Sequence, residues 1–157
     1  GGNISDFMCY LLERSIKTLG VRIEKHNANA QIVAEFLKDN PSVKKVYYPG
    51  LTDHPNYEIA KKQMHGFGGM LSFEINEKLD AKEFQNSLKM IKASMSLAGV
   101  ESTILMPSLT SHALLSEEER NRQGISDGLL RLSVGIEDVE DIVFDLQQAL
   151  QKIQNSK

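Results

Sequence analysis

Arg131 is the residue of this chain whose type and setting most clearly suggest chemistry. It lies in the stretch DGLLRLSVGIED, residues 127–138, whose apolar residues predict a buried strand. A guanidinium stays charged at any accessible pH, and burying it without a partner is costly. Side chains alternate across a strand, so Leu130, Leu132 and Val134 share one face and Arg131 lies on the other. We therefore expect Arg131 to meet a partner on that second face.

Two kinds of partner fit this arginine. Its planar fork matches a carboxylate or phosphate with two parallel hydrogen bonds, which a lysine cannot form. Arg131 therefore indicates recognition of an anionic ligand. An internal salt bridge with one of the 21 acidic residues would also explain it. The residues alone leave both interpretations open.

The segment SMSLAGVES, residues 94–102, is the second candidate. Small residues around Ala98 allow the backbone to approach a ligand closely, and Ser94 and Ser96 bring hydroxyl groups. A tight turn would explain the same residues without a ligand. We interpret the glycine-rich stretch GFGG, residues 66–69, as a turn. It precedes a predicted strand, whereas a dinucleotide-binding loop follows a strand and opens a helix.

The other reactive side chains give weaker signals. None of the four histidines has the spacing of metal ligands, and Cys9 has no second cysteine to share a metal or a disulfide. We therefore expect no metal site. Cys9 falls in the apolar stripe of the first predicted helix, which favours a buried structural thiol. The chain contains no nucleophile elbow and no serine-histidine-aspartate order.

The elements that position these residues are predicted to be helices and strands that alternate along the chain. The apolar spacing predicts a long helix, or two helices in line, over residues 5–39, with Gly20 marking a kink, and a closing helix over 137–154. We predict one α+β domain over residues 1–157, in which helices cover one face of a small, mainly antiparallel sheet. The shorter predicted elements are strands within 43–50, 66–75 and 92–97 and helices within 54–64, 80–91 and 116–124.

Composition narrows the class of protein. An apolar fraction of 41% and a charged fraction of 25% over 157 residues are typical of a globular domain with its own core. The net charge of -3 argues against a nucleic-acid partner. No apolar run approaches the roughly 20 residues that cross a bilayer, so we expect no membrane association. The single cysteine fits a reducing compartment, and we expect a cytoplasmic protein.

Several motifs follow one another through nearly the whole chain: LLERSIKTLGVRIEKHNANAQIVAEFL, VYYPGLTDHP, QMHGFGGMLSFEI, SLAGVES and DGLLRLSVGIED. Together, and in this order, they resemble the C-terminal domain of the cystathionine synthase/lyase family, the pyridoxal-phosphate enzymes of cysteine and methionine metabolism. The resemblance implies the C-terminal, substrate-side domain of fold type I, and thus a fragment of a larger enzyme.

The resemblance also implies roles for particular residues. In this family the arginine of the R-x-S-V-G-x-E motif binds the α-carboxylate of the substrate, and Arg131 occupies that position. The serine of the S-L-G-G loop helps to hold the same carboxylate, and Ser96 matches it. The Schiff-base lysine and most contacts to pyridoxal phosphate lie in a large domain upstream. We therefore expect no catalytic residue in this chain, and the fragment alone should be inactive.

Two departures from the family pattern bear on the reaction. Met95 stands where many γ-acting members have a glutamate, which makes it a candidate specificity position, and Ala98 replaces a usual glycine. The resemblance implies a cystathionine β-lyase or cystathionine γ-synthase that acts on sulfur-containing amino acids as a homotetramer. An O-acetylhomoserine sulfhydrylase or methionine γ-lyase on the same scaffold is the alternative, as is a non-catalytic amino-acid-binding module. We expect a structural or loop-ordering role for His112.

Overall fold

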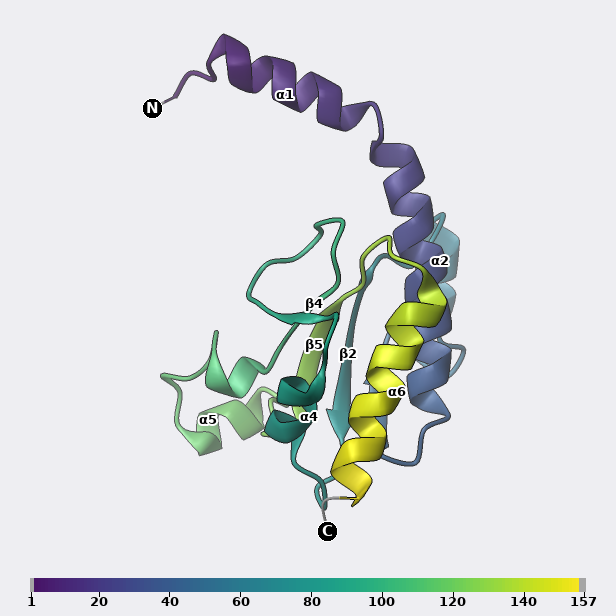
Figure 1. The fold of residues 1–157 in the computed structure, drawn as a ribbon, viewed down its shortest axis with the longest axis vertical. Helices are drawn as coiled ribbons and strands as arrows, with labels where there is room; N and C mark the ends of the chain where they lie inside the picture. The colour runs from purple at the N-terminus through teal and green to yellow at the C-terminus, as the bar shows by residue number, and fades with distance from the viewer. Residues whose placement is uncertain (1, 156–157) are drawn as a thin grey trace.

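A five-stranded sheet forms the centre of the computed structural model, which describes residues 2–155. Adjacent strands are antiparallel except for β3 and β4, which are parallel. Figure 1 shows helices α2 and α6 on one face of this sheet, which confirms the predicted two-layer α+β fold. In sheet order the strands are β1 (Val43–Tyr47), β2 (Met70–Ile75), β5 (Leu129–Ser133), β4 (Thr103–Leu105) and β3 (Lys92–Ala93).

The helices lie close to the predicted positions, and their ends follow the expected capping chemistry. Asp80 accepts hydrogen bonds from the first turn of α4, and Ser116 forms a capping box with Glu119 at the start of α5. Gly124, with φ +73°, follows α5 in the left-handed region that favours glycine. The helices are α1 (Asp6–Ile16), α2 (Leu19–Lys38), α3 (Tyr57–Gln63), α4 (Ala81–Ser87), α5 (Glu117–Arg122), α6 (Val139–Asn155) and the short 3-10 helix η1 (Pro107–Leu109).

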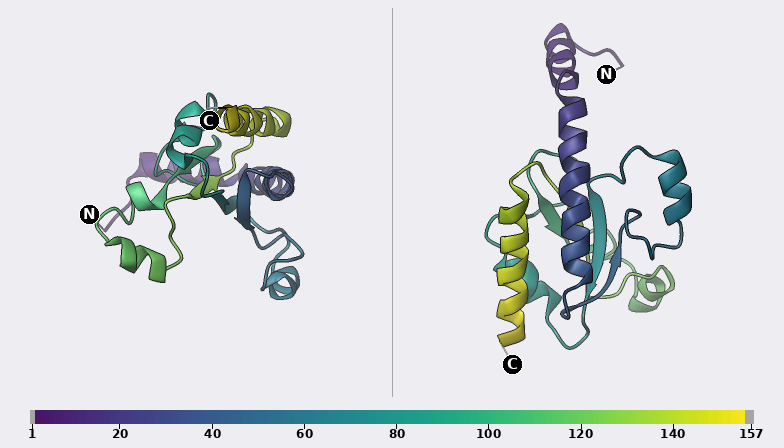
Figure 2. Two further views of the ribbon diagram at one scale, coloured as in Figure 1. Left: turned by 90° about the horizontal axis from the view of Figure 1, so that it is seen from below. Right: turned by 90° about the vertical axis from the view of Figure 1, so that its right-hand side faces the viewer.

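The core lies between the sheet and the pair α2 and α6, which run side by side in Figure 2. Every second residue of the central strands is buried there, including Leu130 and Leu132 of β5 and Phe73 of β2. Burying one such side chain contributes about 1.5–3 kcal/mol, so this face is strongly specified. The opposite face of β5 then has to carry Arg131.

The predicted N-terminal helix is in fact two helices that meet at an angle, as Figure 1 shows. The break lies at Lys17 and Thr18, whereas Gly20 lies inside the first turn of α2. At the break the carbonyl oxygen of Ser15 accepts hydrogen bonds from Thr18 Oγ1 and Arg22 Nη2. These side chains satisfy an orphan carbonyl of the helix end, so the kink depends on them and not on glycine flexibility.

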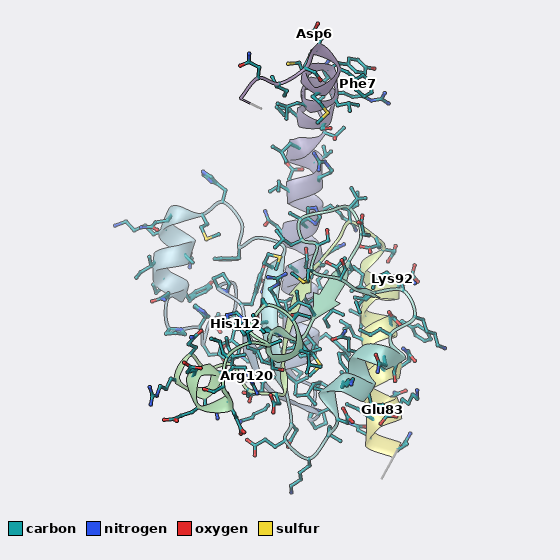
Figure 3. All side chains as sticks on the ribbon, turned by 90° about the vertical axis from the view of Figure 1, so that its left-hand side faces the viewer. Asp6, Phe7, Glu83, Lys92, His112 and Arg120 are labelled. Atoms are coloured by element: carbon teal, nitrogen blue, oxygen red, sulfur yellow. The ribbon has the colours of Figure 1, made fainter. Side chains whose placement is uncertain are left out.

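Helix α1 extends away from the sheet, and Figure 3 shows Asp6 and Phe7 at its far end. None of its residues is buried, and Phe7 is 68% exposed. The prediction of a buried Cys9 is therefore wrong, because the thiol is exposed. The helical period does give α1 an apolar stripe, but the body of the domain over residues 2–155 does not cover it. No helix in that range is both long enough and apolar enough to span a bilayer.

Candidate functional site

Arg131 occupies the middle of the central strand β5. It is half-buried, and its register partners are Ser72 on β2 and Leu105 on β4. Its Nη2 donates a hydrogen bond to the carbonyl oxygen of Met95, 3.3 Å away. Within residues 2–155 the guanidinium forms no ion pair, so the structure does not show the internal salt bridge considered above.

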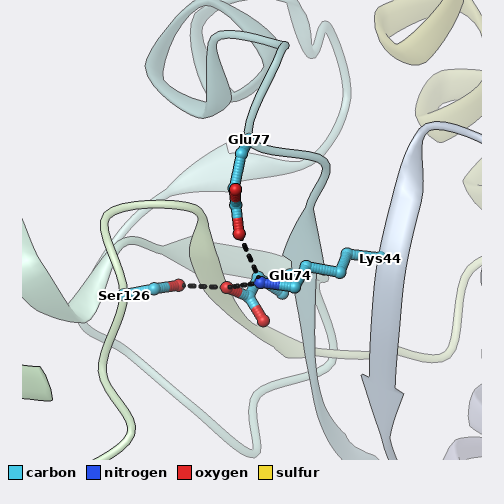
Figure 4. A network of polar contacts seen from close by, with 4 residues as sticks. All are labelled: Lys44, Glu74, Glu77 and Ser126. Atoms are coloured by element: carbon cyan, nitrogen blue, oxygen red, sulfur yellow. Dashed lines mark hydrogen bonds and ion pairs between the residues drawn. The ribbon is translucent and has the colours of Figure 1, made fainter.

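An acid on the same face of the sheet as Arg131 is already engaged. Glu74 lies two residues beyond Ser72 on β2 and therefore on the same face as Arg131. Its carboxylate instead accepts from Ser126 Oγ at 2.7 Å and from Lys44 Nζ at 3.4 Å, as Figure 4 shows. This network satisfies the buried Glu74 locally, so among residues 2–155 the guanidinium has no carboxylate partner.

The same network extends to the surface. Lys44 Nζ also donates to Glu77 at 2.6 Å. This hydrogen bond lowers the pKa of the Glu77 carboxyl and raises the pKa of the Lys44 ammonium. Both side chains are in contact with solvent, so the pair contributes little to stability. We regard this cluster as structural.

A shallow hollow opens beside Arg131. It encloses about 160 Å³ and is lined by Tyr47, Met70, Leu71 and Ser72 together with the arginine. The only hydrogen bond that the guanidinium makes to residues 2–155 is the one to Met95, so several of its N–H donors remain for a ligand. The hollow can therefore present a planar, positively charged fork to a small anion.

The loop of residues 94–102 contacts β5 and brings the predicted residues together. Met95 contacts Arg131 through its carbonyl group, and its side chain is 64% exposed. Ser96 follows directly; its side chain is exposed, and its carbonyl oxygen accepts a hydrogen bond from Thr103 Oγ1 at 2.8 Å. Arg131, Met95 and Ser96 thus lie in one region, at the junction of β5 and the loop.

Ala98 explains why a glycine is usual at its position. Its φ is +60°, in the left-handed region where an L side chain crowds the backbone. Its backbone N–H donates to Ser133 Oγ at 3.0 Å, which ties the middle of the loop to the end of β5. The loop therefore adopts a conformation that is strained for alanine and that this hydrogen bond helps to hold.

The C-terminal end of the loop is fixed by residues that the sequence reasoning did not single out. Ser102 is 1% exposed, and its backbone N–H and hydroxyl both donate to the carboxylate of Glu137, at 2.5 and 3.0 Å. The Ser102 hydroxyl in turn accepts from Gly135 N at 2.8 Å. The sequence did offer one indication of this contact. The motifs SLAGVES and RLSVGIE end in Ser102 and Glu137, the two residues that meet here.

Gly135 and Asn29 complete this junction. A Cβ on Gly135 would collide with the carbonyl oxygen of Val100, so only glycine fits. Asn29 of α2 donates from its side-chain amide to the carbonyl oxygens of Gly135 and Glu137, at 3.0 and 2.9 Å. Asn29, on the buried face of α2, therefore supports the turn that carries Glu137.

The GFGG stretch is a turn before β2, as predicted. Gly68 has φ +84°, its N–H donates to Asn27 Oδ1 at 2.8 Å, and its carbonyl oxygen accepts from Tyr48 Oη at 2.9 Å. Burial raises the pKa of Tyr48 to about 12. Because the Gly68 N–H is already used by Asn27, this turn does not offer it to a phosphate.

The remaining sequence candidates lie elsewhere. His112 follows η1, and its Nδ1 is 2.8 Å from Ser111 Oγ. The described part of the chain contains no group of three histidine, cysteine, aspartate or glutamate side chains arranged to hold a metal ion.

The fold and the site together define an α+β domain whose central strand carries an arginine beside a small hollow. The family model described as Cys/Met metabolism PLP-dependent enzyme matches residues 1–151. The chain therefore belongs to this family of pyridoxal-phosphate enzymes.

Curated relatives support the assignment. The chain is 51% identical over 143 residues to a cystathionine beta-lyase of Lactococcus lactis subsp. cremoris. This alignment covers 91% of this chain and 38% of that protein. It is 49% identical over 145 residues to an L-methionine gamma-lyase of Fusobacterium nucleatum. That alignment covers 92% of this chain and 37% of the relative.

A solved structure agrees with the fold. The crystal structure of cystathionine gamma-lyase from Lactobacillus plantarum, complexed with L-serine, has a TM-score of 0.90 and 40% identity. The match covers 96% of this chain and 40% of that one. The chain thus spans about two-fifths of the length of the relatives it matches.

Proposed function

We propose that residues 1–157 form the C-terminal, substrate-side domain of a pyridoxal-phosphate-dependent enzyme that acts on sulfur-containing amino acids. Our preferred reactions are those of cystathionine β-lyase and cystathionine γ-synthase. The observation that carries the proposal is Arg131, a guanidinium on the central strand with no ion pair among the described residues and a hollow beside it. The identity of 51% to a cystathionine beta-lyase supports the choice of reaction.

In this proposal Arg131 binds the α-carboxylate of the substrate. The hydrogen bond from Nη2 to Met95 fixes one corner of the guanidinium, so its remaining donors can face the carboxylate in a defined plane. Ser96, exposed on the same loop, supplies a hydroxyl donor to that carboxylate. Holding this group limits rotation of the amino acid and so orients its Cα–H bond for reaction.

The residues of this chain do not by themselves fit pyridoxal phosphate. The hollow beside Arg131 has no lysine in its lining, and the Gly68 N–H of the glycine-rich turn is bonded to Asn27. We therefore propose that the cofactor is held mainly by parts of the enzyme outside these 157 residues, and that this chain alone is inactive. A lysine-dependent visible absorbance band from this chain mixed with pyridoxal phosphate would contradict the proposal.

Met95 bears on the choice of reaction. Its apolar, exposed side chain cannot pair with a substrate ammonium or relay a proton, whereas a glutamate at this position could. This favours β-elimination or a more apolar substrate. The identity to an L-methionine gamma-lyase keeps γ-elimination as the second candidate, and an O-acetylhomoserine sulfhydrylase or a non-catalytic amino-acid-binding module remain further alternatives.

The reaction is tested by the products formed from L-cystathionine with the full-length parent enzyme. Homocysteine and pyruvate would establish β-lyase chemistry. Cysteine and 2-oxobutanoate would show γ-lyase chemistry and refute our use of Met95. Persistence of cystathionine would favour the synthase or the sulfhydrylase.

The role of Arg131 is tested by Arg131→Lys in the same enzyme. We expect kcat/KM to fall about 30- to 1,000-fold, or about 2–4 kcal/mol, because lysine cannot reproduce the planar fork. Arg122→Lys is the matched control, since Arg122 is exposed on α5 and pairs only with Glu118 among the described residues. If Arg131→Lys instead unfolds the protein while activity per folded molecule stays constant, Arg131 is structural.

Assembly and location follow from the same proposal. We propose a cytoplasmic homotetramer for the full-length enzyme. Light scattering coupled to size-exclusion chromatography measures the assembly directly, and a monomeric parent enzyme would contradict it.

A further inference from the structure

We propose that Glu137 is a positioning residue that holds the loop of residues 94–102 on the sheet, so that Arg131 and Ser96 face the same substrate carboxylate. This inference rests on the proposed function. Glu137 itself lies in the turn between β5 and α6.

The first step is the geometry of Glu137. Both of its carboxylate oxygens accept hydrogen bonds from Ser102, one from the backbone N–H and one from the hydroxyl. The Ser102 hydroxyl also accepts from Gly135 N, and Ile136 N donates to Val100 O at 2.9 Å. These bonds join the end of the loop to the turn that follows β5.

The second step is that Glu137 does not serve as a helix cap. The neighbouring Asp138 has that role, because its Oδ1 accepts from Glu140 N at 2.9 Å and its carbonyl oxygen accepts from Ile142 N at 3.2 Å. Two adjacent acids therefore have separate tasks. Asp138 stabilises the start of α6, and Glu137 holds the loop.

The third step connects this attachment to the substrate site. Three side chains that follow one another on β5 and its turn hold the loop: Arg131 at Met95, Ser133 at Ala98, and Glu137 at Ser102. The bond from Arg131 to Met95 is long, at 3.3 Å, and cannot hold the loop alone. Ala98 adds left-handed strain at the middle attachment. Loss of Glu137 should therefore let the loop shift and disorder both Ser96 and the guanidinium.

Two variants of Glu137 distinguish a role that depends on the length of the side chain from one that depends on its negative charge. Glu137→Gln keeps the length of the side chain and one oxygen that can accept from Ser102 N. Glu137→Asp keeps the charge but is one methylene too short to reach Ser102. If Glu137 acts by holding the loop, glutamine should preserve function better than aspartate. A residue that acted through its charge would give the opposite order.

The experiment measures kcat and KM of the full-length enzyme with L-cystathionine as substrate, for Glu137→Ala, Glu137→Asp and Glu137→Gln. We expect KM to rise about 10-fold for alanine and aspartate and to stay within about 3-fold for glutamine, with kcat changing less than KM. Asp138→Ala is the control. It should lower the melting temperature, because it removes the cap of α6, and leave KM unchanged.

A double variant separates this inference from the proposed function. In an Arg131→Lys background, Glu137→Ala should raise KM by less than it does in the parent, since the fork it positions is gone. If Arg131→Lys raises KM but Glu137→Ala does not, the inference fails and the proposed function stands. If Arg131→Lys leaves kcat/KM unchanged, the role proposed for Arg131 fails first. Equal effects of glutamine and alanine, or a better aspartate, would also overturn the positioning role.

Discussion

Asp145 offers a direct test of how the segment before the loop is held. This carboxylate lies on α6 and is 4% exposed. Its Oδ1 accepts from Lys89 N at 2.8 Å, and its Oδ2 accepts from Met90 N and Ile91 N, both at 2.9 Å. These three N–H groups belong to the segment between α4 and β3. One buried side chain therefore replaces the backbone partners that this segment lacks.

The size of the effect follows from the burial of each donor. In Asp145→Ala all three N–H groups lose this partner; the Ile91 bond is buried, and the Met90 and Lys89 bonds are partly buried. A buried unsatisfied N–H costs about 1–3 kcal/mol, so we expect a total loss of about 3–4 kcal/mol. Asp145→Asn keeps one oxygen but turns an amide N–H₂ toward a donor, and we expect a loss of about 2–3 kcal/mol.

The assay is urea unfolding of this 157-residue chain followed by circular dichroism at 25 °C. Asp141→Asn is the matched control, because Asp141 lies on the exposed side of the same helix. It should change the free energy of unfolding by less than about 1 kcal/mol. A loss below about 1 kcal/mol for Asp145→Ala, or one equal to that of the control, would show that this segment does not depend on Asp145.

Two further changes test other parts of the domain. Burial raises the pKa of Tyr48 from 10.0 to about 12, so the folded state retains a proton that the unfolded state loses above pH 10. The parent chain should therefore lose about 1.4 kcal/mol per pH unit between pH 10 and 12 relative to Tyr48→Phe. Urea unfolding across that range checks this, and parallel curves would contradict it. Ala98→Gly should raise the free energy of unfolding by about 0.5–1 kcal/mol, because release from the left-handed strain exceeds the added chain entropy. A lower urea midpoint for the glycine variant would exclude strain at Ala98.

Local patterns were enough to predict most of the fold. Alternation of apolar residues placed Leu130 and Leu132 on the core face and left Arg131 on the other, and both placements hold in the structure. The helices predicted within 80–91 and 116–124 are present, and each begins at a capping residue, Asp80 and Ser116. These signals depend on neighbours within a few residues, so they can be read from the chain directly.

Contacts between distant residues could not be predicted in this way. Glu137 bonds Ser102 across 35 positions, and Asp145 bonds Ile91 across 54. Strand β4 has three residues, too few for a period to be visible. The exposure of Cys9 depends on the angle between α1 and α2 at the break that follows α1. The spacing of apolar residues does not determine that angle. Periodicity shows that a face is apolar but not what covers it.

The order of the strands has a consequence for how this domain can associate with other chains. Both margins of the sheet are poor templates for an added strand. At one margin, β1 carries the exposed Lys44 and Lys45 and has an irregular register between Val43 and Lys45. At the other, β3 has only two residues. Lysines, bulges and very short edge strands are features that prevent edge-to-edge pairing. These edges therefore disfavour association through added strands, and the large apolar side chains exposed along α1 offer a different kind of contact surface.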